Sequence, residues 1–207
     1  MELTVDMAIN WMEIARDKYK ENKETLTMLD QAIGDGDHGI NMARGYQAVV
    51  EKIAETEYDH PADVLKSVAM TLMAKVGGAS GPLYGTAFMN MSMVMKGKTV
   101  DQKVLKEAID HAITGMKQRG KSEIGEKTLL DVWDQVSSYL DSEDLSEPKE
   151  IIEVCQAVVE DTKQIQATKG RASYLNERSI GHEDPGSMSS FYLFEALAEV
   201  LEKEATV

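Results

Sequence analysis

The sequence has few of the residues that mark disulfide-rich, exported or membrane proteins. Cys155 is the only cysteine in 207 residues, so neither an intramolecular disulfide nor a CxxC zinc site can form. No apolar run approaches the ~20 residues of a membrane span. The first twenty residues also lack the basic region and apolar core of a signal peptide. We therefore expect a cytoplasmic location and no membrane partner.

Positive charge is also scarce. The chain has 22 Lys and Arg residues against 36 Asp and Glu, which gives a net charge of −14. Such a chain repels the phosphate backbone of nucleic acids, so we expect no nucleic-acid partner. A phosphorylated ligand would need metal ions and local basic groups in order to bind.

Proline is rare as well, with only four residues, and no segment alternates with period two for long enough to form a strand. Apolar residues at spacings of three and four instead predict helices. We expect them near residues 4–20, 24–29, 37–53, 61–76, 87–96, 104–120, 129–140, 151–165 and 191–201. An acidic loop precedes Pro148 and a long loop covers 168–184. The predicted fold class is all-α: one domain over residues 1–207, with about eight antiparallel helices in an up-and-down barrel or bundle.

The segment DQAIGDGDHGIN, residues 30–41, concentrates carboxylates and glycines. Asp30, Asp35 and Asp37 fall within eight residues, and carboxylates so close repel one another unless a cation lies between them. Oxygen ligands on a loose turn suit Mg2+ first and Ca2+ second. A calcium hand fits poorly, because Ile40 and Tyr46 occupy positions where that motif needs glycine and glutamate. The segment predicts a metal site at one end of a helical domain.

Three glycine-bearing turns are predicted to open helices, namely 37–39, 80–82 and 184–186. Each combines a capping residue with a glycine, so first-turn N–H groups and the positive end of the helix dipole remain accessible to an anion. Any one of these turns alone is more often only a cap. Together with the three aspartates they favour a phosphate-bearing ligand bridged through Mg2+.

Several single residues leave alternatives open. His38 could be a surface residue, a contact to the ligand or a proton carrier, and we favour ligand contact. Arg171 and Arg178 could supply the counter-charge for phosphate, and we favour Arg178. Cys155 and the methionines at 89, 91, 93 and 95 are interpreted as core residues.

Six motifs together carry a resemblance to a known family. They are DQAIGDGDHGINM (30–42), GGASGPLYG (77–85), GEKT (125–128), GRASYL (170–175), ERS (177–179) and DPG (184–186). In this order they resemble the nucleotide-binding L subunits (DhaL) of phosphoenolpyruvate-dependent dihydroxyacetone kinases and the homologous C-terminal domain of ATP-dependent dihydroxyacetone kinases. The departures are small: Glu126, Leu129 and Asn176 stand where relatives often have aspartate, methionine and glycine.

The resemblance implies an antiparallel eight-helix barrel that holds ADP or ATP as a bound prosthetic group, with two Mg2+ ions, at one end. The implied metal ligands are Asp30, Asp35 and Asp37. The implied nucleotide contacts are His38, Gly39, Ile40, Asn41, Gly78, Ala79, Ser80, Gly120, Leu129, Arg178, Asp184, Pro185 and Gly186. No residue is implied as a covalent nucleophile.

The implied function is phosphotransfer by a kinase subunit. Bound ADP would accept a phosphoryl group from a phosphohistidine protein of the phosphotransferase system, and the resulting ATP would phosphorylate dihydroxyacetone on a separate substrate-binding subunit. One alternative is an ATP-exchanging kinase domain that serves dihydroxyacetone or a protein-bound fatty acid. Others are a non-enzymatic nucleotide-binding regulator and a helical interaction module with a structural cation. A homodimer is also left open.

Overall fold

The computed structural model describes residues 2–142 and 148–205, and the predicted acidic loop before Pro148 therefore lies outside the described residues for most of its length. Within the described part there is no β-strand, only a single bridge between Glu2 and Asp101. The elements are α1 (Val5–Glu21), α2 (Lys23–Ile33), α3 (His38–Ile53), α4 (Pro61–Lys75), α5 (Ser80–Met95), α6 (Gln102–Gly120), α7 (Leu129–Ser142), α8 (Glu150–Asp161), the 3-10 segments η1 (Thr162–Gln164) and η2 (Arg171–Ser179), and α9 (Pro185–Ala205).

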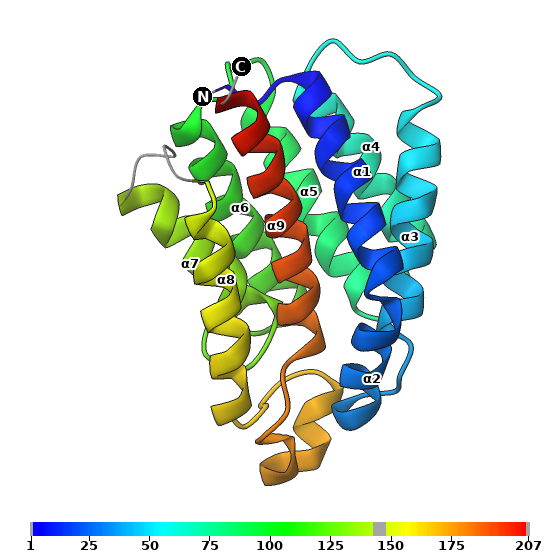
Figure 1. The fold of residues 1–207 in the computed structure, drawn as a ribbon, viewed down its shortest axis with the longest axis vertical. Coiled ribbons are helices and arrows are strands. Elements are labelled where there is room, and N and C mark those ends of the chain that lie inside the picture. The colour runs from blue at the N-terminus through cyan, green and yellow to red at the C-terminus, as the bar shows by residue number, and fades with distance from the viewer. Residues whose placement is uncertain (1, 143–147, 206–207) are drawn as a thin grey trace.

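The long helices form a closed ring. Each packs on the next in the order α1, α3, α4, α5, α6, α7, α8 and α9, and α9 packs back on α1. The helices run up and down along the long axis, and the two ends of the chain lie at the same end of the ring (Figure 1). Because directions alternate, α3, α5, α7 and α9 all begin at the opposite end, near α2 and η2. The predicted all-α fold of antiparallel helices is therefore confirmed.

Local sequence explains where the helices begin. The Thr4 side chain accepts a hydrogen bond from Met7 N at 3.2 Å, which caps α1. Pro61 is the first residue of α4, where its missing N–H costs nothing. Asp101 accepts from Val104 N at 2.9 Å and caps α6 in the same way. Short polar residues at two of these positions and proline at the third set the boundaries that the apolar spacing alone leaves open.

Three details differ from the sequence prediction. The helix expected to reach Ile165 ends at Asp161, where η1 begins, and the loop expected over 168–184 contains η2. Met93 is 62% exposed, whereas Met91 and Met95 are fully buried. The core prediction was wrong for Met93 because residues four apart share a helix face, whereas a residue midway between them points to the other side.

Aromatic side chains fill the middle of the ring. Trp133 lies edge-on to Phe194, with ring centroids 4.8 Å apart, and Trp11 lies edge-on to Phe88 at 5.6 Å. The indole N–H of Trp11 donates to the Leu193 carbonyl at 2.8 Å. These rings join α1, α5, α7 and α9 across the core, so the positions of the helix starts are fixed by packing as well as by caps.

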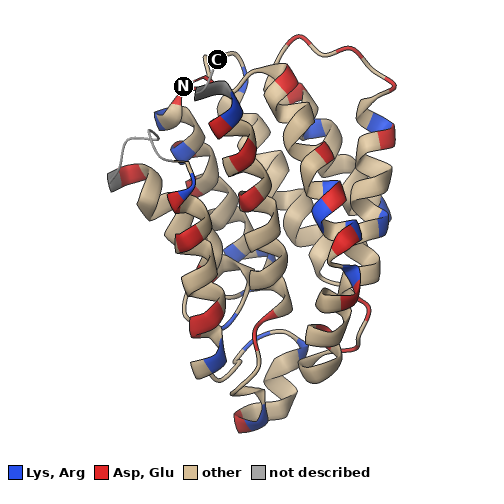
Figure 2. Cartoon of the chain, viewed as in Figure 1, with Lys and Arg blue, Asp and Glu red and all other residues tan. Residues whose placement is uncertain are grey.

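Charged residues are spread along the helices, and Figure 2 shows acidic residues over the length of the viewed side. No helix in the described ranges is both long and apolar enough to cross a membrane.

A polar network fixes the first turns of α9 against α5. The Tyr84 hydroxyl lies 2.7 Å from Ser189 Oγ and 2.8 Å from Ser190 Oγ, and Trp133 Nε1 donates to Ser190 Oγ at 3.1 Å. Ser189 Oγ also donates to the Gly186 carbonyl at 3.0 Å. All these groups are buried, so each needs a partner.

We expect the Tyr84→Phe substitution to lower the free energy of unfolding by about 1–3 kcal/mol, because it leaves buried serine hydroxyls short of a partner. Chemical denaturation measures this directly. The control is Tyr174→Phe, since Tyr174 is 82% exposed and should change stability by less than ~0.5 kcal/mol. Equal effects of the two substitutions would contradict the role given to the network.

Candidate functional site

A cavity of about 240 Å3 opens at the end of the ring where α3, α5, α7 and α9 begin. Its lining comes from segments far apart in the sequence: the loop after α2, the turns before α5 and α7, η2, and the start of α9. The lining residues are Asp30, Ile33, Gly34, Asp35, Asp37, His38, Asn41, Gly77, Gly78, Ala79, Ser80, Leu83, Gly120, Ser122, Lys127, Thr128, Leu129, Lys169, Gly170, Arg171, Ala172, Asp184, Pro185 and Gly186.

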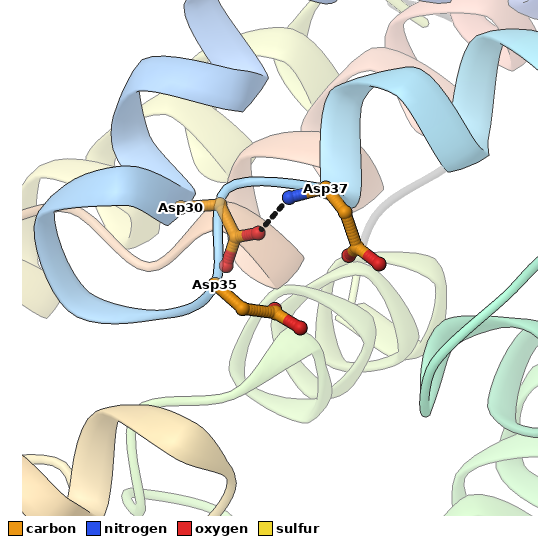
Figure 3. A group of neighbouring side chains, drawn as sticks. All are labelled: Asp30, Asp35 and Asp37. Carbon is orange, nitrogen blue, oxygen red and sulfur yellow. Dashed lines mark hydrogen bonds between the residues drawn. The ribbon is translucent and has the colours of Figure 1, made fainter.

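The three aspartates meet at one side of this cavity. Each offers a carboxylate oxygen, and these oxygens all lie within 4.8 Å of one another (Figure 3). Asp30 is buried near the end of α2, whereas Asp35 and Asp37 are exposed on the loop. A hard divalent cation fits this donor set, because it prefers carboxylate oxygens and would cancel their mutual repulsion.

Asp30 also organises the start of α3. One of its oxygens accepts from Asp37 N at 2.9 Å (Figure 3). The same oxygen accepts from His38 N at 3.0 Å. Asp37 occupies the N-cap position that the sequence predicted, but its own side chain makes no capping bond. Asp30, on the preceding helix, caps α3 instead. The Asp37 carboxylate therefore remains available to a ligand.

His38 lies at the first position of α3 with its ring buried against the cavity. Its Nδ1 is 3.1 Å from Ser80 Oγ, at the start of α5. Its Nε2 is buried and has no hydrogen-bond partner among the described residues. Burial lowers the pKa of the imidazole, opposed by the nearby charges of Asp30 and Asp37. A buried ring nitrogen without a partner suits a polar ligand in the cavity.

Gly39 and Ile40 follow His38 but do not line the cavity. A Cβ at Gly39 would lie 2.1 Å from the Lys23 carbonyl oxygen and 2.8 Å from Thr27 N. Glycine is therefore needed here for the close approach of α3 to α2. The Ile40 side chain is 50% exposed. Only the backbone N–H groups of these two residues remain as contacts to an anion at the helix start.

The start of α9 forms the opposite wall. Asp184 Oδ2 accepts from Ser187 N at 2.7 Å, which caps α9, and Asp184 N donates to Thr162 Oγ1 at 3.0 Å. Burial raises the pKa of Asp184 to about 7. A Cβ at Gly186 would lie 3.0 Å from this carboxylate and 3.4 Å from Leu129 N, so glycine lets the two walls approach.

Gly120 and Leu129 both line the cavity, as do Leu83 and Ser122. A Cβ at Gly120 would come within 3.1 Å of Ser122 Oγ and 3.3 Å of Leu83 Cδ2. The close approach of Gly120 to Leu83, with Leu129 also in the lining, suits the binding of a flat ring.

The arginine at the cavity is Arg171 and not the expected Arg178. Arg171 Nη2 lies 2.8 Å from Asp35 Oδ2, whereas Arg178 is exposed and is not among the lining residues. The non-helical backbone of Asn176, with φ 51° and ψ −129°, kinks η2 between the two arginines. The chain direction therefore changes between them, which sequence spacing does not reveal.

Lys127 is the main lining residue that sequence reasoning did not single out. It is 1% exposed, and its ammonium group donates to the carbonyls of Ile165, Ser179 and His182 at 3.1, 2.6 and 2.7 Å. Burial lowers its pKa, opposed by the charge of Asp184. These three bonds hold the segment that carries η2 over the cavity. A lysine in a polar stretch ordinarily indicates an exposed side chain, and only the GEKT motif pointed here.

Lys127, Lys169 and Arg171 bring positive charge to the cavity of a strongly acidic chain. The expected counter-charge for a phosphorylated ligand is therefore present, although it comes from residues other than Arg178.

Comparisons with known proteins place the chain among kinase components. A family model described as "DAK2 domain" matches residues 32–199. The chain is 50% identical to the "PEP-dependent dihydroxyacetone kinase 1, ADP-binding subunit DhaL" of Listeria innocua, over 94% of this chain and 96% of that protein. It is 45% identical to the "PTS-dependent dihydroxyacetone kinase, ADP-binding subunit DhaL" of Lactococcus lactis, over 96% and 99% of the two chains.

A solved structure shares the fold. The dihydroxyacetone kinase from C. freundii, described in complex with AMP-PNP and Mg2+, matches with a TM-score of 0.72 and 21% identity. The match covers 95% of this chain and 33% of that longer one.

We expect the Gly39→Ala substitution to lower the free energy of unfolding by about 1–3 kcal/mol, because the added methyl group overpacks the contact between α2 and α3. Helix propensity alone predicts the opposite sign, a gain of up to ~1 kcal/mol. Urea denaturation without added ligand decides between them. A more stable variant would show that the close approach does not require glycine.

We also expect a pH-dependent effect of Asp184→Asn. The pKa of Asp184 rises from 3.8 to about 7 in the fold, so its contribution to stability is largest below pH 4 and is lost as pH rises through about 7. The variant lacks this loss, so its unfolding free energy relative to wild type should increase by roughly 2 kcal/mol between pH 5 and 8. Parallel pH curves for the two proteins would contradict the assignment.

Proposed function

The chain belongs to the DAK2 domain family, and on this premise we propose that it is the ADP-binding subunit of a phosphoenolpyruvate-dependent dihydroxyacetone kinase. The single observation that carries the proposal is the meeting of three carboxylates with the starts of α3, α5 and α9 around one cavity. Identity of 50% and 45% to two proteins named ADP-binding subunits DhaL, over nearly their whole length, supports it.

In this proposal the metal and the nucleotide share the cavity. Asp30, Asp35 and Asp37 would hold two Mg2+ ions, which would supply positive charge beside the phosphates. The backbone of residues 38–41 and of Ala79 and Ser80 contacts the phosphates. The base lies between Gly120 and Leu129, and the turn 184–186 closes the pocket. The cavity lining combines carboxylates, accessible helix starts and apolar side chains, a set that suits a nucleoside diphosphate.

Bound ADP supplies the acceptor for a phosphoryl group from a phosphohistidine protein and, as ATP, the donor to dihydroxyacetone on a partner subunit. The residues of this chain position and neutralise charge. The aspartates hold the metal charge beside the phosphate oxygens, and the helix starts together with Lys169 and Arg171 favour negative charge at the transferred group. No side chain needs to act as a covalent nucleophile. This role places the chain in the cytoplasm with two protein partners.

An ATP-exchanging kinase is the second candidate, and the shared fold with the longer C. freundii dihydroxyacetone kinase favours it. The two candidates differ in how they hold the nucleotide. A relay subunit keeps ADP through purification and turnover, whereas an exchanging kinase releases ADP to solution and takes up free ATP.

We expect Asp35→Asn and Asp37→Asn each to lower the affinity for Mg-ADP by more than about 10-fold, because even outer-shell changes at metal sites cost 10–100-fold. The measurement is the amount of ADP released per protein when purified variants are denatured. Asp17→Asn is the matched control, since it removes the same charge from α1 outside the cavity. ADP at wild-type stoichiometry in both cavity variants would refute the metal assignment.

A further inference from the structure

An arginine on the outside of α3 is hydrogen-bonded to a side chain that lines the cavity. Asn41 lines the cavity and is 6% exposed. One turn later on the same helix, Arg44 is exposed and its Nη2 donates to Asn41 Oδ1 at 2.8 Å. Arg44 lies in a separate groove between α3 and α4 and not in the cavity. The pair therefore links the outer surface to the predicted phosphate end of the site.

The chemistry of the pair sets the orientation of the amide. A guanidinium group can only donate hydrogen bonds, so the atom of Asn41 that faces Arg44 is the carbonyl oxygen. The amino group then faces away from Arg44. The hydrogen bond to Arg44 is made through Oδ1. Among residues 2–142 and 148–205, the amino group of Asn41 has no hydrogen-bond partner. Two N–H donors are thereby left for another acceptor, and a phosphate oxygen in the cavity that Asn41 lines would match them.

A second contact ties the same arginine to the end of α4, just before the turn that leads to α5. Arg44 Nε donates to the Lys75 carbonyl at 3.3 Å, at the last residue of α4. The turn that follows contains Gly77, where a Cβ would lie 3.1 Å from Asn41 Oδ1 and 3.2 Å from Nδ2. Glycine at 77 leaves the amide its place, and Arg44 holds the amide and the turn together.

We propose that Arg44 is a positioning residue for the bound nucleotide: it holds the Asn41 amide with its N–H donors toward the phosphates. This rests on the proposed function, because the amide needs an anion to bind. Arg44 acts through Asn41 and not by direct attraction of the phosphates, since an exposed charge outside the cavity is screened by solvent and salt.

A double-mutant cycle tests the proposal by calorimetric titration of nucleotide-stripped full-length protein with Mg-ADP. We expect Arg44→Met to weaken binding about 3- to 10-fold, the usual contribution of one ordinary hydrogen bond. In an Asn41→Ala background the same substitution should change affinity less than ~1.5-fold, because the amide it positions is gone.

Two further variants distinguish the loss of a positive charge from the displacement of the Asn41 amide. Lys52→Met is the control, since it removes a positive charge from the same groove and Lys52 pairs with Glu55 instead of Asn41; it should leave affinity unchanged. Gly77→Ala displaces the amide without changing charge and should weaken binding in the same direction as Arg44→Met. Unfolding free energies measured without ligand show whether each variant is folded.

The results distinguish a failure of the proposed function from a failure of the role given to Arg44. A wild-type protein that binds no Mg-ADP would overturn the proposed function and this inference with it. Wild-type binding that is unaffected by Arg44→Met in folded protein would overturn this inference alone. A loss that persists in the Asn41→Ala background, and that Lys52→Met reproduces, would show that Arg44 acts by charge and would equally overturn it.

Discussion

The balance of charge at the aspartate loop is the constraint on which the site depends. Three carboxylate oxygens lie within 4.8 Å of one another. Two unit charges about 4 Å apart repel by about 1 kcal/mol in water and about 4 kcal/mol near a protein surface. The dipole of a helix stabilises a carboxylate at its start by only about 0.3–1 kcal/mol. The helix starts alone therefore do not offset the repulsion. Arg171, 2.8 Å from Asp35, offsets part of it, and the three carboxylates suit a divalent cation for the rest.

The ring explains how such a loop comes to face phosphate-binding groups. Because neighbouring helices alternate in direction, every second helix begins at the same end (Figure 1). Asp30, at the end of α2, accepts the N–H groups of Asp37 and His38 and so fixes the start of α3. His38 and Ser80 then connect that start to α5. The carboxylates, the helix ends and the polar network of Tyr84 form one connected arrangement.

The sequence was sufficient for the fold class, the helix starts at the three glycine-bearing turns, and the aspartate cluster, because caps, glycines and closely spaced carboxylates act over a few residues. It was not sufficient where distant backbone decides the outcome. Gly39 serves the contact of α3 with α2, which only the packed helices reveal. The choice between Arg171 and Arg178 depends on a kink at Asn176. The burial of Lys127 depends on three carbonyls that lie 38 or more residues away.

In the proposed role, this cavity keeps ADP as a phosphoryl carrier. The most direct test is to record the phosphorus NMR spectrum of purified protein and then add phosphoenolpyruvate with the phosphocarrier proteins of the phosphotransferase system. If ADP is the carrier, protein-bound ADP should convert to protein-bound ATP. It should return to ADP when dihydroxyacetone and its binding subunit are added. Unchanged bound ADP, or turnover only with free ATP, would contradict it.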